Sequence, residues 1–82
     1  MNILYQYYNE IVLTFTDYYV ELRDSVIVIE VPEDSKPFNS VCDKIAAQLN
    51  RIADTLDPRD KQIVVRVERG GESKELELEP TI

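Results

Sequence analysis

The sequence predicts an α+β fold in which an antiparallel sheet carries one α-helix packed on one face. Two observations predict it. One long stretch has apolar residues at helical spacing, and blocks rich in β-branched and aromatic residues, divided by short turns, stand before and after it. A chain of 82 residues builds a single hydrophobic core, so we expect one domain spanning residues 1–82.

The block before the helix is interpreted as a meander of three or four strands. Two-residue turns at residues 16–17 and 24–25 place apolar residues opposite one another in both hairpins. The expected partners are Ile11 with Leu22, Leu13 with Val20, Val20 with Ile29, and Leu22 with Ile27. Both turns assign the same apolar face to the middle strand. Residues 3–8 are expected to add a first strand because tyrosine favours sheets, with one longer strand or a loose arm as alternatives.

The predicted helix covers residues 35–56. Its apolar residues recur every three or four positions and form one stripe: Phe38, Val41, Cys42, Ile45, Ala46, Leu49, Ile52, Ala53 and Leu56. Ser35 is the expected N-cap, with Asn39 as an alternative if the helix begins later. Asp57 is followed by proline, which disfavours helical backbone at the preceding residue and ends the helix there.

A C-terminal hairpin completes the predicted sheet. Gly70 and Gly71 suit a type I′ turn, in which both central residues take positive φ. The resulting pairs are Ile63 with Leu78 and Val65 with Leu76 on the inner side, and Val64 with Glu77 and Arg66 with Glu75 on the outer side. This hairpin can join either edge of the meander, so the strand order stays open.

The charge of the chain narrows its possible partners. Sixteen acidic residues stand against nine basic ones, and the net charge of -7 lies mostly before residue 35. Such a body repels nucleic acid and anionic membranes and attracts basic protein surfaces. No stretch is long and apolar enough to span a membrane, and the N-terminus lacks a basic leader. Cys42, the single cysteine, is expected to be buried, and a cytoplasmic protein without disulfides follows.

The residues that most enzymes use are scarce. The chain contains no histidine, and its only thiol lies on the apolar stripe of the helix. Gly70 and Gly71 precede a strand, whereas a phosphate-binding loop precedes a helix. Neither 33–34 nor 57–60 has the alternating acidic spacing of a calcium loop. We therefore expect no enzymatic activity, no metal and no cofactor.

Two surfaces are predicted to bind a partner. The outer sheet face is expected to expose apolar side chains, namely Val12, Tyr19, Val26, Val28 and Val64. The last strand carries a carboxylate row of Glu75, Glu77 and Glu79, which adds to the acidic residues of the first block, including Glu21 and Glu30. The alternative interpretations are that the valines reflect strand preference alone and that the glutamates are a solvated edge that resists aggregation.

These features predict a small acidic protein that binds and inhibits a larger basic protein, as immunity proteins, antitoxins and phage anti-defence proteins do, in one form by mimicking nucleic acid. The alternative is a homodimer or larger homo-oligomer with a structural or assembly role, joined through the outer apolar sheet face. The predicted partner-binding residues are Val12, Tyr19, Glu21, Val28, Glu30, Val64, Glu75, Glu77 and Glu79.

Overall fold

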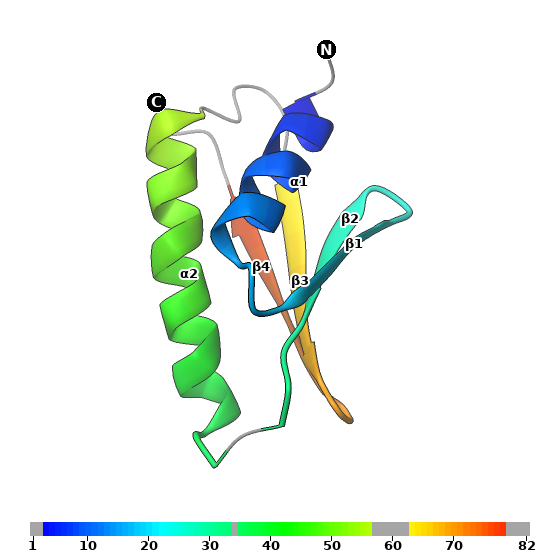
Figure 1. The fold of residues 1–82 in the computed structure, drawn as a ribbon, viewed down its shortest axis with the longest axis vertical. Helices are drawn as coiled ribbons and strands as arrows, with labels where there is room; N and C mark the ends of the chain where they lie inside the picture. Colours follow the sequence, from blue (N-terminus) through cyan, green and yellow to red (C-terminus); the bar gives the residue numbers. More distant parts are fainter. Residues whose placement is uncertain (1–2, 34, 57–62, 79–82) are drawn as a thin grey trace.

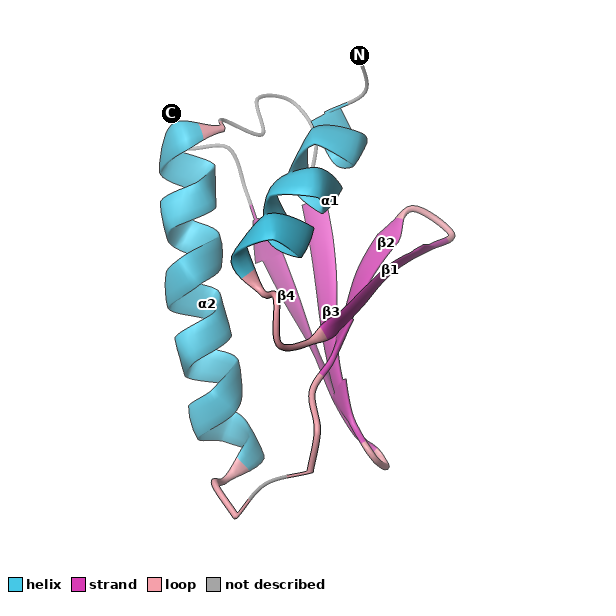
Figure 2. Ribbon diagram, in the orientation of Figure 1, coloured by secondary structure: helices cyan, strands magenta, loops and turns pink. Residues whose placement is uncertain are grey.

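The computed structural model describes residues 3–33, 35–56 and 63–78. It contains two helices and one four-stranded sheet (Figure 1). In chain order the elements are α1 (Ile3–Thr14), β1 (Tyr19–Arg23), β2 (Val26–Glu30), α2 (Phe38–Thr55), β3 (Ile63–Arg69) and β4 (Glu72–Leu78). Side chains of both helices share one hydrophobic core with one face of the sheet, so the helices form a layer on that face (Figure 2). No helix of the described residues covers the other face, which we call the open face.

The sheet is mixed, which corrects the expectation of a purely antiparallel one. Its order is β1-β2-β3-β4, and β2 pairs with β3 in parallel. A helix packed along the sheet returns the chain to the end at which β2 began, so β3 runs in the same direction as β2. The two most apolar strands thereby take the central positions, and the more polar β1 and β4 form the edges.

Both hairpins within the sheet have the predicted register. Val20 pairs with Ile29 and Leu22 with Ile27, while Val65 pairs with Leu76 in the last hairpin. The remaining predicted pairs of that hairpin, Ile63 with Leu78, Val64 with Glu77 and Arg66 with Glu75, are also present. The glycine turn differs in one respect, because Gly70 alone of the two glycines has positive φ, at 58°.

The first strands of the predicted meander are wrong, because residues 3–14 form the helix α1. The core side of α1 includes Leu4, Tyr7, Tyr8 and Ile11, and Phe15 continues the same spacing just past its end. Steps of three and four residues match a helix, and they outweigh the preference of tyrosine and valine for sheets. Ile11 and Leu13 therefore form no strand pairs with Leu22 and Val20.

Helix α2 confirms the predicted amphipathic helix with shorter ends. It begins at Phe38, with Pro37 at the N-cap position and no side-chain capping bond, so Ser35 is not the cap. It ends at Thr55 with Leu56 as its C-cap, and the predicted stop at 57–58 lies outside the described residues. Neither helix in the described part of the chain combines the length and apolar character needed to cross a membrane.

Arg69 ties the entry of α2 to the last hairpin. Its guanidinium donates to the Lys36 carbonyl at 2.7 Å and to the Glu72 carboxylate at 3.2 Å. It also lies 5.3 Å from the ring centre of Phe38, the first residue of α2. These contacts fix where α2 starts above β3 and β4.

Candidate functional site

The open face of the sheet carries most of the predicted partner-binding residues. Because side chains alternate along a strand, the residues between the core positions point to this face. They are Tyr19, Glu21, Arg23, Val26, Val28, Glu30, Val64, Arg66, Glu68, Ser73, Glu75 and Glu77. Five glutamates and two arginines give this face of the described strands a net negative charge.

Both arginines of the open face are already paired with glutamates. Arg23 bonds to Glu21 and lies 3.9 Å from Glu68, while Arg66 lies 2.7 Å from Glu75 and 4.0 Å from Glu68. The hydrogen bond and charge of Glu21 raise the pKa of the Arg23 guanidinium. A chain of ion pairs therefore crosses the sheet from β1 to β4, with Glu68 shared between the two arginines.

This network explains why Val28 is fully buried although no helix covers it. Val28 lies between Glu21 on β1 and Arg66 on β3 in the strand register. The contact of Arg23 with Glu68 passes from β1 to β3 and so over β2, the strand of Val28. The aliphatic stems of long charged residues cover apolar surface in this way while their charges stay in water. The exposure predicted for Val28 is thus not found.

The other predicted partner-binding residues lie on the open sheet face, on α1 or outside the described residues. Tyr19 is 59% exposed at the sheet edge, whereas Val64 is half-buried. Glu30, Glu75 and Glu77 are exposed on the open face and Glu21 is half-buried there. Val12 is 39% exposed but belongs to α1, so it is on the helical layer and not on the sheet face. Glu79 lies outside the described residues.

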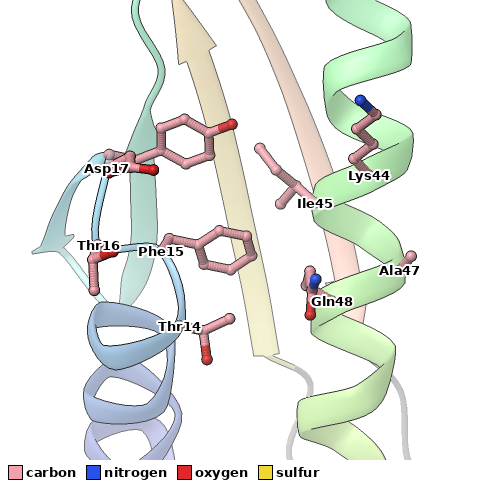
Figure 3. Close-up of a pocket in the computed structure, with 9 residues that line it drawn as sticks. Thr14, Phe15, Thr16, Asp17, Lys44, Ile45, Ala47 and Gln48 are labelled. Atoms are coloured by element: carbon pink, nitrogen blue, oxygen red, sulfur yellow. The ribbon is translucent and has the colours of Figure 1, made fainter.

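A groove between the two helices is a feature that the sequence did not indicate. One cavity of about 380 Å³ lies between the end of α1 and the middle of α2, and a second of about 280 Å³ lies farther along both helices. Thr14 and Gln48 line both cavities, so the two are neighbours between the helices, and we call them together the groove. Figure 3 shows Phe15 and Ile45 pointing toward each other across its first part.

The walls of this groove carry opposite charges. Glu10 and Asp17 lie on the α1 side, whereas Lys44 and Arg51 come from α2. Lys44 and Arg51 are seven residues apart and therefore share a side of the helix. The groove depends on how α1 packs beside α2, and no local pattern reveals that arrangement. The sequence predicts strands at residues 3–8 and 11–15, and without a helix there no groove beside α2 is expected.

The described residues offer little beyond these surfaces for chemistry. No cluster of three or more cysteine, aspartate or glutamate side chains within them can hold a metal ion. Cys42 is buried, as predicted, and burial raises the pKa of its thiol, which keeps it protonated and unreactive in the folded protein.

Searches of the chain against protein-family models, curated proteins and solved structures find no match.

Proposed function

We propose that this protein is a small non-enzymatic binding protein whose open sheet face docks on a basic surface of a larger protein and blocks it. The observation that carries the proposal is the charge of that face. Its two arginines are neutralised by glutamates of the same face, which leaves an excess of carboxylates directed at solvent. A partner surface rich in lysine and arginine complements such a face and associates quickly at low salt.

Glu30 is the best candidate for direct contact. It is exposed, it lies on a central strand, and it forms no ion pair within 4 Å among the described residues. Glu75 on the edge strand is also exposed and extends the negative surface toward β4. A partner that covers the middle of the sheet would reach both side chains.

The proposed role is inhibition, by analogy of size and charge with immunity proteins, antitoxins and phage-encoded inhibitors. Glu75 and Glu77, two residues apart on β4, and Glu30 and Glu68, paired on the central strands, also provide the kind of closely spaced negative charge that a nucleic-acid-binding groove recognises. We infer a basic protein partner, and nucleic acid itself is disfavoured by the negative charge of the face.

The test compares two double variants that change the net charge equally. Glu30→Lys with Glu75→Lys reverses two charges on the open face, whereas Asp43→Lys with Asp54→Lys reverses two exposed charges on α2. Wild type and both variants are immobilised and exposed to a lysate of the source cells, and the bound protein is eluted with a salt gradient. We expect a partner retained by wild type and the α2 variant, released by salt and lost by the sheet variant.

Equal retention by the sheet variant, or binding that salt does not weaken, would contradict the electrostatic docking.

The alternative of a homo-oligomer joined through the sheet face receives less support than the sequence indicated, because Val28 is buried and Val26 and Val64 are half-buried.

A further inference from the structure

The first cavity of the groove has an apolar floor made by Phe15, Tyr18 and Ile45. The rings of Phe15 and Tyr18 are stacked, with 5.9 Å between their centroids and 16° between their planes. Ile45 of α2 points toward Phe15 from the other side (Figure 3). All three side chains pack against the core, which fixes the floor in place. The cavity volume of about 380 Å³ falls within the range of small-molecule sites.

The rim of this cavity carries one carboxylate and one ammonium group that are not paired with each other. Asp17 follows α1 and Lys44 belongs to α2, both side chains are exposed, and Figure 3 shows them on opposite sides of the cavity. Neither forms an ion pair within 4.0 Å among the described residues, whereas Arg23, Arg66 and Arg69 are each paired with a glutamate there. The packing of α1 beside α2 therefore holds two opposite charges apart above an apolar floor.

This arrangement matches a ligand that carries both charges and an apolar side chain. An anion alone satisfies Lys44 and is repelled by Asp17, a cation alone does the reverse, and a neutral apolar molecule leaves both charges without a partner. A free α-amino acid offers a carboxylate to Lys44, an ammonium group to Asp17 and a side chain to the apolar floor. The hydroxyls of Thr14 and Thr16 and the amide of Gln48 supply further hydrogen-bonding groups at the rim. We propose that the first cavity binds a free amino acid with an aromatic or large aliphatic side chain.

The second cavity of the groove fits such a ligand less well. It also has an acid on one wall and a base on the other, Glu10 and Arg51, but its volume is smaller, about 280 Å³, and none of its lining residues is aromatic. The amino-acid site is therefore confined to the first cavity. That cavity lies in the helical layer, whereas the proposed protein partner docks on the open sheet face. The inference goes beyond the proposed function and does not depend on it.

The first test titrates wild type with L-phenylalanine at physiological salt and follows the backbone amide signals by two-dimensional NMR. We expect saturable shifts around the first cavity and a dissociation constant on the order of 1 mM. Phenethylamine lacks the carboxylate and 3-phenylpropionate lacks the ammonium group, so each should bind about fivefold more weakly. Glycine lacks the apolar side chain and should bind more weakly still. The absence of saturable shifts, or equal affinity for either single-charge compound, would overturn the proposal.

The second test determines whether each charge of the ligand meets the side chain proposed for it. Lys44→Gln should weaken the binding of L-phenylalanine about fivefold, yet it should bind phenethylamine at least as tightly as wild type does, because that compound has no carboxylate to lose. Asp17→Asn should behave in the same way toward L-phenylalanine and 3-phenylpropionate.

The matched controls are Arg51→Gln and Asp54→Asn, which make the same charge changes at exposed positions outside the first cavity. Both should leave the affinity for L-phenylalanine nearly unchanged, because salt screens charges at that separation. The spectra of the ligand-free variants verify that all four are folded. Equal weakening of all three ligands by a rim variant, or an equal effect of its control, would overturn the proposal.

Discussion

Asp24 and Ser25 connect β1 to β2 with positive φ angles of 50° and 67°, as a tight two-residue hairpin turn requires. Aspartate tolerates this region of backbone space, but serine has a side chain that the region disfavours. The strain at Ser25 is accepted because the strands on either side bury Leu22 and Ile27 against the core. Local strain and long-range burial thus oppose each other at a single residue.

Ser25→Gly should stabilise the protein by about 0.5 to 1 kcal/mol, because glycine adopts positive φ without a steric cost. Urea unfolding followed by circular dichroism gives the change in the free energy of unfolding. Ser40→Gly, within α2, should instead lower stability, since glycine disfavours helix. A loss of stability in the Ser25 variant would show that the serine side chain contributes more than its backbone strain costs.

At the scale of elements, α1 is held to α2 by a partly buried hydrogen bond as well as by apolar packing. The Tyr7 hydroxyl donates to the carbonyl oxygen of Leu56, the C-cap of α2, and Tyr7 is fully buried. The last carbonyls of a helix lack partners within it, so this bond satisfies one of them. The bond also joins residues 49 positions apart and so fixes the end of α2 against α1.

Tyr7→Phe should lower the free energy of unfolding by about 1 to 2 kcal/mol, because the Leu56 carbonyl loses its donor in a partly buried position. The matched control is Tyr5→Phe, which removes the same hydroxyl from a side chain that is 53% exposed and should change stability little. Chemical denaturation of the two variants beside wild type makes the comparison. Similar values for both would mean that the Tyr7 hydroxyl contributes nothing beyond its ring.

At the scale of the whole molecule, one core cluster includes residues of α1, α2 and the sheet, so these elements should unfold together. Cys42 lies in this cluster and is 1% exposed. Its burial, which raises the thiol pKa, makes the thiolate available only when the core opens. The reactivity of the Cys42 thiol therefore reports on unfolding.

We expect Cys42 to react with a disulfide reagent at pH 7.5 only at the rate at which the protein opens, and immediately in denaturant. Because the folded thiol has the raised pKa, its contribution to stability is complete below the unfolded value of about 8.5 and is lost as the pH rises through the folded value. Stability should therefore fall in alkaline solution, and Cys42→Ala should reduce that fall. Rapid reaction of the native protein at pH 7.5 would contradict the burial of Cys42.

The sequence by itself determined the features that depend on neighbouring residues. The amphipathic stripe of α2, the two hairpin registers and the burial of Cys42 follow from spacing and from turn residues a few positions away. Part of the acidic open face followed as well, because alternation along a strand assigns Glu30, Glu75 and Glu77 to one side.

Only the tertiary structure decided three further features. Residues 3–14 became a helix because Tyr7 and Ile11 reach the core from one side, although their composition favours a strand. The parallel pairing of β2 with β3 follows from the way α2 lies on the sheet. Val28 is buried because Arg23 and Glu68, 45 residues apart in the chain, meet above it. The parallel pairing and the burial of Val28 depend on contacts between distant segments, which no local pattern contains. For α1 the helical spacing of Tyr7, Ile11 and Phe15 is local, but it competes with a composition that favours a strand.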